Sequence, residues 1–189
     1  RCSPLDFTGL VMHPGAHLGT GEEIAVERIP EAFREILPET PPEVQLLLEN
    51  TAGQGTYLGG DFAHLAALLK GFDEDRFGVC FDTCHAHTAG YDLSSSESYT
   101  EVMAKFDRLV GLEQIKAFHL NDCLKPCGSK VDRHTHIGQG TIGRTGFACL
   151  MQDQRLAAIP MLLETPKGDD GEMDRVNLAL LRELAGESL

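Results

Sequence analysis

The sequence lacks any apolar run that approaches the roughly 18 residues of a membrane-spanning helix, so no membrane association of that kind is expected. It also lacks a signal-peptide pattern and a C-x-x-C pair. We therefore expect an intracellular protein with reduced thiols. The six cysteines are Cys2, Cys80, Cys84, Cys123, Cys127 and Cys149. Cys80 and Cys84 are expected to be small buried apolar residues rather than metal ligands.

Basic residues are scarce. The chain has 16 Lys and Arg against 29 Asp and Glu, a formal net charge of −13, which by itself argues against a nucleic-acid partner. The segment 115–145 differs, because its five basic and two acidic side chains give a local charge of +3. A local basic surface is therefore compatible with the acidic whole.

The composition is that of one folded unit. The 189 residues are 42% hydrophobic, which is enough for one core of ordinary size. No low-complexity linker or change of composition divides the chain, and we expect a single domain over residues 1–189.

Five short apolar runs each end in a residue that can bind a hard or borderline metal. The five residues are His13 after LVM, Glu49 after VQLLL, Asp82 after FGVCF, His119 after IKAF and Glu164 after IPMLL. They are separated by about 33 to 45 residues, which suits one βαβ unit each. In a barrel of alternating strands and helices, all strands point their C-terminal ends at one face. The pattern therefore predicts one shared site.

Helical patterns lie between these runs. Apolar residues recur at helical spacing in 62–69, with Asp61 as the N-cap, and again in 102–110 and 176–184. The stretch 22–37 is also helical in pattern, with Pro30 expected to kink or interrupt it. The alternation predicts an α/β protein with a parallel sheet.

Three further residues complete the set of candidate metal ligands. Asp82 and His85 form a D-x-x-H motif, and Asp132 and His134 form a D-x-H motif whose side chains point to the same face of an extended segment. Eight candidate ligands indicate more than one metal ion. Histidine and carboxylate donors without cysteine favour Zn²⁺ or Mn²⁺.

Six segments together resemble the endonuclease IV family, the zinc-dependent apurinic/apyrimidinic (AP) endonucleases of DNA base-excision repair. They are MHPGAH at 12–17, LLENTAGQGTYLG at 47–59, GVCFDTCHAHTAGYD at 78–92, FHLND at 118–122, GSKVDRHTHIGQGTIG at 128–143 and LLETP at 162–166. The resemblance extends from about Leu10 to Leu184.

The resemblance implies a TIM-type (β/α)₈ barrel. Because only five strands are indicated in 189 residues, whereas such barrels have eight strands in about 250 residues, we expect a partial barrel. The match corresponds to the last five βα units, so that the first three units, roughly 90 residues, are expected to be missing.

The resemblance also implies three zinc ions, with Mn²⁺ as an alternative at one site. Glu49 resembles the carboxylate that bridges the first two zincs, and His13 resembles a ligand of the first, which lacks one histidine here. Asp82, His119 and Glu164 resemble the other ligands of the second zinc, and His85, Asp132 and His134 resemble the complete third site.

The implied reaction is hydrolysis of the phosphodiester 5′ to an abasic site, which leaves a 3′-hydroxyl and a 5′-deoxyribose phosphate. Glu49 and Glu164 are the candidate catalytic carboxylates, and a hydroxide held near Glu49 is the expected nucleophile. Lys130, Arg133 and Gln54 are candidate contacts to double-stranded DNA. The protein is expected to act as a monomer, in the bacterial cytoplasm beside the nucleoid, or in a eukaryotic nucleus or mitochondrion.

Two alternatives stay open. A sugar isomerase or epimerase on a related barrel would use Glu49, Asp82, His119 and Glu164 around one or two metals, but it has no need of the third group. A truncated and inactive remnant of the nuclease would bind no metal. The number of bound zinc ions separates these alternatives.

Overall fold

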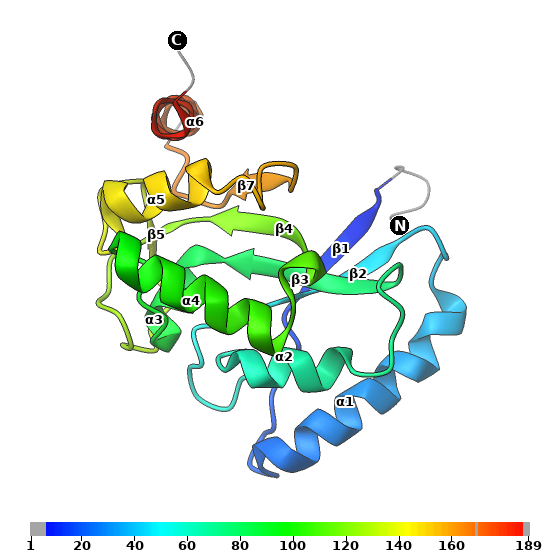
Figure 1. The fold of residues 1–189 in the computed structure, drawn as a ribbon. Coiled ribbons are helices and arrows are strands. Elements are labelled where there is room, and N and C mark those ends of the chain that lie inside the picture. The colour runs from blue at the N-terminus through cyan, green and yellow to red at the C-terminus, as the bar shows by residue number, and fades with distance from the viewer. Residues whose placement is uncertain (1–6, 169, 187–189) are drawn as a thin grey trace.

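The computed structural model describes residues 7–168 and 170–186. Its main sheet has five parallel strands in the order β1-β2-β3-β4-β7 (Figure 1). These strands are β1 (Gly9–Met12), β2 (Gln45–Glu49), β3 (Phe77–Asp82), β4 (Ile115–Leu120) and β7 (Met161–Leu163). All five apolar runs of the sequence therefore form neighbouring strands of one sheet.

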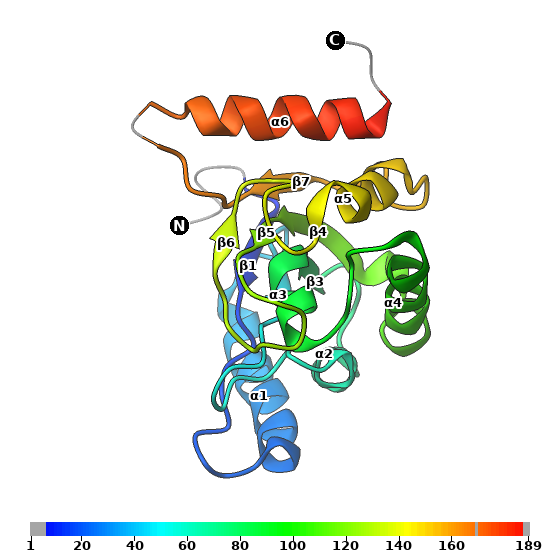
Figure 2. The same cartoon turned by 90° about the vertical axis from the view of Figure 1, so that its left-hand side faces the viewer.

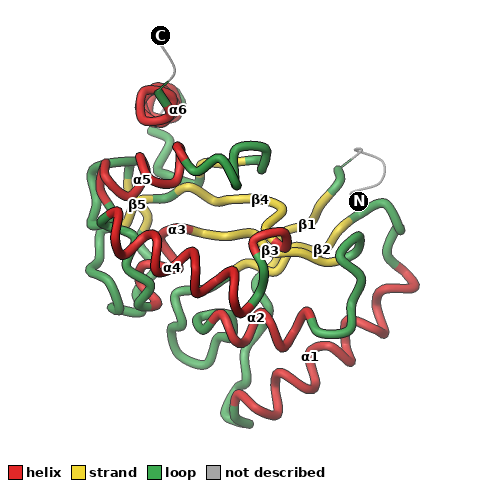
Figure 3. Tube along the Cα trace, in the orientation of Figure 1, coloured by secondary structure: helices red, strands yellow, loops and turns green. Residues whose placement is uncertain are grey.

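Helices connect the strands, as the alternation predicts. They are α1 (Glu22–Ile36), α2 (Phe62–Leu69), α3 (Thr83–Ala89), α4 (Ser96–Leu109), α5 (Gly143–Gln152) and α6 (Glu172–Ala185), with short 3₁₀ turns η2 (Leu37–Glu39) and η3 (Leu112–Gln114). Figure 3 separates helices, strands and loops along the trace. Within the described residues β1 and β7 are the two edges of the sheet. Five parallel strands with connecting helices are the arrangement expected of a partial barrel.

The two faces of the sheet are packed differently. Leu46 and Leu48 of β2 belong to a large hydrophobic core under the helices, in which Phe81 and Phe106 are fully buried. Leu47, between them, belongs instead to a small cluster with Cys80 and Ala117 on the opposite face. This alternation follows from the two-residue period of a strand. Helices α1, α2 and α4 lie along the same side of the sheet in Figures 1 and 2.

The helix predictions hold in outline and fail in three details. Asp61 is the N-cap of α2 and accepts a hydrogen bond from the Ala63 N–H at 2.9 Å. Pro30 does not interrupt α1, which runs continuously from Glu22 to Ile36 with Pro30 buried, whereas the predicted kink stays a prediction. Two residues assigned to buried faces, Leu109 and Val176, are exposed. Met103 in α4 and Leu181 in α6 are buried.

The cysteines also follow expectation. Cys80 and Cys84 are fully buried, and the five cysteines of the described residues are free thiols. Cys2 lies outside the described residues. Within the described part of the chain, no helix is both long and apolar enough to cross a membrane.

Candidate metal centre

The candidate ligands lie at the C-terminal ends of the five strands. Glu49 and Asp82 are the last residues of β2 and β3, His119 is the penultimate residue of β4, and His13 and Glu164 directly follow β1 and β7. Parallel pairing aligns these ends, so that Asp82 and His119, for example, are register partners. Strand ends that are remote in sequence thus meet at one edge, as predicted.

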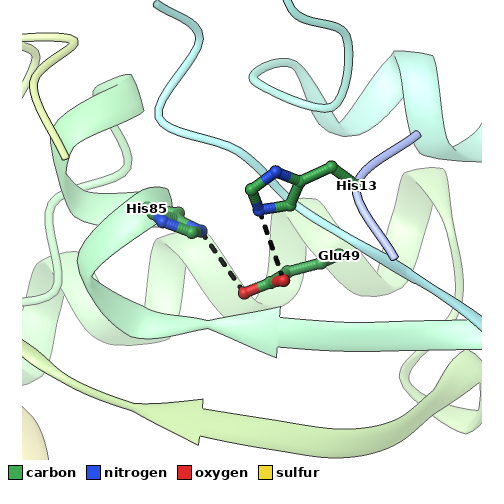
Figure 4. A group of neighbouring side chains, drawn as sticks. All are labelled: His13, Glu49 and His85. Atoms are coloured by element: carbon green, nitrogen blue, oxygen red, sulfur yellow. Dashed lines mark ion pairs between the residues drawn. The ribbon is translucent and has the colours of Figure 1, made fainter. Parts of the chain in front are cut away.

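Glu49 lies at the middle of this group and is almost completely buried. Its Oε2 is 3.4 Å from Nε2 of His13, and its Oε1 is 3.5 Å from Nδ1 of His85 (Figure 4). Nδ1 of His119 approaches the same Oε1 at 2.8 Å. One carboxylate therefore contacts three histidines from three different segments, which is the geometry that a bridging ligand requires.

A second group shares Glu49. The ligand atoms of Glu49, Asp82, His119 and Glu164 all lie within 4.8 Å of one another. Nδ1 of His119 is 3.2 Å from Oε2 of Glu164, whose side chain is 47% exposed. Glu164 is therefore the ligand of this group that faces solvent.

The third group forms around Asp132. Nε2 of His85 is 3.2 Å from Oδ2 of Asp132, and Nε2 of His134 is 3.1 Å from Oδ1. His134 is positioned by a short antiparallel pair, β5 (Asp122–Cys123) with β6 (His134–Thr135). His85 comes from the first turn of α3, where its N–H donates to Oδ1 of Asp82 at 2.7 Å. The two motifs D-x-x-H and D-x-H are thus brought together.

His134 gives a direct indication that this group suits a cation. Its Nε2 is buried and makes no hydrogen bond, although Oδ1 of Asp132 is 3.1 Å away and Oδ2 of Asp82 is 3.8 Å away. A buried nitrogen that faces two carboxylates at close range without a well-directed hydrogen bond is arranged as a ligand would be. The residues present fit Zn²⁺, because the donors are imidazole nitrogens and carboxylate oxygens.

One thiol also lies near this group. Sγ of Cys84 is within 4.8 Å of ligand atoms of Asp132 and His134. Sequence reasoning left Cys84 out because it treated the residue as a small apolar side chain. Its full burial agrees with that interpretation, and its position makes it the sulfur neighbour of the third group.

Two carboxylates of the centre, Glu49 and Asp132, have lowered pKa values. Burial opposes ionisation of Glu49, but hydrogen bonds from His119 and His13 outweigh it and lower the pKa of Glu49 to about 2. The imidazoles of His134 and His85, 3.1 and 3.2 Å from its oxygens, lower the pKa of Asp132. Both side chains are therefore anionic at neutral pH.

Three histidines of the centre, His85, His119 and His134, have raised pKa values when no cation is bound. Burial lowers the pKa of His85, but the negative charge of Asp82 and the hydrogen bond to Asp132 raise it to about 10. For His134, the Asp132 carboxylate 3.1 Å away and the Asp82 charge likewise overcome burial and raise the pKa to about 9. Against burial, the hydrogen bond to Glu49 raises the pKa of His119. Protons thus take the place of cations in neutralising the carboxylates.

Zinc binding is therefore expected to release protons. Zn²⁺ coordinates only neutral imidazole, and His85 and His134 carry protons at pH 7.5 in the metal-free protein, so about two protons should be released per chain. Calorimetric titration in buffers of different ionisation enthalpy measures this number. No buffer dependence of the binding heat would contradict the prediction.

The same pKa values set the sign of a stability effect in the metal-free protein. Because the folded-state pKa values lie above the ordinary value of 6.5, these two histidines stabilise the fold fully below pH 6.5. The stabilisation is lost as pH rises through about 9 to 10. A His134→Gln variant serves as the control, and its loss of stability on going from pH 6.5 to pH 10 should be smaller.

Two asparagines hold the ligands, and sequence reasoning missed both. Nδ2 of Asn50 donates to the Asp82 carbonyl at 2.9 Å, and Oδ1 of Asn50 accepts from the Asp82 N–H at 2.7 Å. Nδ2 of Asn121 donates to Oδ2 of Asp82 at 2.7 Å, and its Oδ1 accepts from the Glu164 N–H at 3.0 Å. Both amides are buried. The sequence signal that could have identified them is their position directly after strands that carry ligands.

Asp122 organises the loop behind His134. Its buried carboxylate accepts hydrogen bonds from the N–H groups of Cys123, Gly140, Ile142 and Gly143.

Asp122→Asn keeps the shape of the side chain and removes its charge. It also replaces one carboxylate oxygen by an NH₂ group, a donor that faces backbone N–H groups. Because hydrogen bonds to a charged group contribute about 1.5–3 kcal/mol each, we expect a loss of about 2–4 kcal/mol in the free energy of unfolding. Urea denaturation measures it, and a loss below about 0.5 kcal/mol, the range of ordinary surface substitutions, would contradict the prediction.

The candidate DNA contacts surround the third group. Gln54, Lys130 and Arg133 are exposed. Oε1 of Gln54 accepts a hydrogen bond from the Asp132 N–H at 3.4 Å, and Nη1 of Arg133 donates to the Asp132 carbonyl at 2.6 Å. Lys130 has a positive φ of 55°, which a non-glycine residue adopts rarely. Their contact with DNA stays a prediction.

The remaining four histidines make local contacts away from the eight candidate ligands. Nδ1 of His17 accepts from the Gly19 N–H, Nε2 of His64 pairs with Glu22 at 3.3 Å, Nδ1 of His87 accepts from the Leu93 N–H, and Nδ1 of His136 is 3.3 Å from the Asn177 amide nitrogen. None of these contacts involves one of the eight candidate ligands.

Comparison with known proteins places the centre in a family. The family model described as xylose isomerase-like TIM barrel matches residues 1–184. A relative from Geotalea daltonii, named probable endonuclease 4, is 52% identical over 186 residues, which are 97% of this chain and 65% of that protein. The chain thus spans slightly less than two thirds of the relative's length.

Solved structures of other proteins share the fold of this chain. The crystal structure of endonuclease IV from Thermus thermophilus superposes with a TM-score of 0.82 at 37% identity, over 99% of this chain and 65% of that one. A D-tagatose 3-epimerase-like protein, 21% identical with a TM-score of 0.73 over 98% of this chain and 66% of its own, shares the fold. The predicted TIM-type barrel, present in part, is confirmed. The chain therefore belongs to the xylose isomerase-like TIM barrel family and, as its sequence motifs predict, to the endonuclease IV proteins within it.

Proposed function

We propose that this chain carries the metal-dependent active site of an AP endonuclease. In this proposal it hydrolyses the phosphodiester 5′ to an abasic site in double-stranded DNA and leaves a 3′-hydroxyl and a 5′-deoxyribose phosphate. The observation that carries the proposal is the third group. His85, Asp132 and His134 adjoin the Glu49 group within hydrogen-bonding distances, and a sugar isomerase has no use for them.

The proposal assigns Zn²⁺ to three sites, with Mn²⁺ as an alternative at one. His13 and Glu49 would hold the first cation, Glu49, Asp82, His119 and Glu164 the second, and His85, Asp132 and His134 the third. Clustered divalent cations supply Lewis-acid neutralisation of the charge that develops on the attacking and leaving oxygens of a phosphodiester.

The side chains of the centre contribute orientation and charge. Glu49, ionised because its pKa is about 2, accepts hydrogen bonds and can orient an attacking water. Glu164, half exposed at the solvent side, is the second carboxylate within reach of a bound phosphate group. Asn121 keeps the Asp82 carboxylate aimed into the centre at 2.7 Å.

Exposed residues around the third group would bind the DNA backbone. Lys130 and Arg133 flank Asp132 and provide positive charge in an otherwise acidic protein. Contacts to phosphate position a duplex without reading its sequence, which suffices for a lesion that has no base. A nucleotide without a base also costs least to move out of the helix.

The test uses the zinc-loaded chain of 189 residues and a duplex with a single abasic site. We expect incision on the 5′ side of the lesion, a 3′-hydroxyl terminus and zinc bound at least at the second and third groups, with an undamaged duplex left intact. A folded chain that binds these ions and leaves the abasic duplex uncut would contradict the proposal. One or two ions with isomerisation of a sugar would support the isomerase, and no bound zinc the inactive remnant.

The proposal includes the setting of the reaction. The relative from Geotalea daltonii is bacterial, and an enzyme of DNA repair would act in the bacterial cytoplasm beside the nucleoid. A monomer is expected, and the elution volume of the purified chain in size-exclusion chromatography tests this.

A further inference from the structure

A second group of potential ligands lies outside the metal centre. It consists of His87 near the end of α3, Asp92 in the loop that follows, and Cys127 in the loop between β5 and β6, and we call it the peripheral triad. One ligand atom from each residue lies within 4.8 Å of the other two. None of the three belongs to the eight candidate ligands of the centre.

The histidine of the peripheral triad is oriented for coordination. His87 is 2% exposed, and its Nδ1 lies 3.6 Å from Oδ1 of Asp92. Nδ1 also accepts a hydrogen bond from the Leu93 N–H at 3.2 Å. An accepting nitrogen carries its lone pair rather than a proton, so this nitrogen is in the form that a cation needs, and coordination would replace one long hydrogen bond.

The loop that carries Cys127 is fixed against the histidine by backbone contacts. The Gly128 N–H donates to the His87 carbonyl at 3.1 Å, and the Lys130 N–H donates to the Thr88 carbonyl at 2.9 Å. Cys127 therefore stays near His87 without any cation. Cys127 and the Asp92 side chain, which is 46% exposed, leave the solvent side of the peripheral triad open.

We propose that the peripheral triad binds a divalent cation of borderline softness, Zn²⁺ in the first place, with water as the fourth ligand. One thiolate, one imidazole and one carboxylate are a donor set that tetrahedral zinc accepts and that Mg²⁺ or Ca²⁺ does not favour. A cation here would tie the end of α3 to the loop before Asp132. It would therefore restrain Lys130, whose N–H already bonds the Thr88 carbonyl near the end of α3.

Thiolate coordination allows this site to be distinguished from the metal centre. The eight candidate ligands of the centre offer only nitrogen and oxygen, whereas Cys127 offers sulfur. Co²⁺ bound to a thiolate absorbs in the near ultraviolet through charge transfer from sulfur. We expect this absorption when the metal-free chain of 189 residues is titrated with Co²⁺. Its absence would overturn the proposal.

Four variants test whether the Co²⁺ absorption comes from the sulfur of Cys127. Cys127→Ser should abolish the absorption, and Cys149→Ser, a change in α5 away from the peripheral triad, should retain it. Cys84→Ser should also retain it, although Cys84 adjoins the third group of the centre. Loss in Cys84→Ser with retention in Cys127→Ser would place the sulfur ligand at the centre and overturn the proposal. Glu49→Gln should retain the absorption, which makes the result independent of the proposed nuclease.

A conservative change tests the carboxylate. Asp92→Asn keeps an oxygen that can accept the hydrogen bond of the Ser94 N–H and removes the negative charge. We expect the Co²⁺ affinity read from the thiolate absorption to fall by at least about tenfold, the lower end of what outer-shell partners contribute. An unchanged affinity would exclude Asp92 as a ligand and contradict the triad. Far-ultraviolet circular dichroism of each variant controls for folding.

Discussion

Replacement of Glu49 by Gln is expected to lower the rate of incision at an abasic site by more than about 100-fold, because a residue that merely orients a ligand already contributes about 10–100-fold. Glu49 contacts His13, His85 and His119, and no other described carboxylate contacts three histidines of the centre. An amide retains the size but not the charge or the two accepting oxygens. The first two cations should therefore be lost together.

Zinc content and incision rate are measured on the same preparations. Glu183→Gln is the matched control, because Glu183 is an exposed glutamate that pairs with Arg144 away from the centre. It should retain both zinc content and activity. Full activity of Glu49→Gln would refute the bridging role, whereas full zinc content with lost activity would limit Glu49 to the chemical step.

Asn121→Ala is expected to affect both stability and zinc affinity. The buried amide is hydrogen-bonded to Asp82 and to the Glu164 N–H, and each partner that is left unsatisfied costs about 1–3 kcal/mol. We therefore expect a loss of about 2–5 kcal/mol in the free energy of unfolding of the metal-free protein. Zinc affinity should fall by about 10–100-fold, because the Asp82 carboxylate is no longer oriented.

Asn177→Ala separates the two effects. Asn177 is also buried, accepts from the Ile137 N–H and donates to Thr165, but it has no contact with the candidate ligands. It should destabilise the protein by a similar amount and leave zinc affinity unchanged. Equal zinc affinities in the two variants would show that Asn121 has only a structural role.

The ligands could be predicted from the sequence because they are tied to a periodic feature. Each apolar run predicts a strand, parallel strands end at a common edge, and the residue at the end is therefore placed without knowledge of the loops. Asp132 lies in the loop before β6 and His134 is the first residue of that two-residue strand, and both were found by their spacing and by the family resemblance. The structure brings all eight together.

The residues that hold the ligands in place were harder to predict from the sequence. Asn50 and Asn121 act through hydrogen bonds to residues 32 and 39 positions away, and no local pattern reports such pairings. The short helix α3 begins immediately after Asp82, which caps it, so one residue serves as strand end, helix cap and candidate ligand. Leu109 and Val176 are apolar residues near helix ends, where spacing alone does not tell which side a neighbouring segment covers.

The side-chain amide of Asn50 extends the hydrogen bonding between β2 and β3 by one residue beyond the last backbone pair. It bonds both the N–H and the carbonyl of Asp82, as a neighbouring strand residue would. A slip of β3 by one residue would turn the Asp82 side chain to the other face of the sheet. The two hydrogen bonds of Asn50 oppose such a slip at the end of the sheet where the ligands lie. Correct strand register therefore places the Asp82 carboxylate on the face of the sheet that carries the centre.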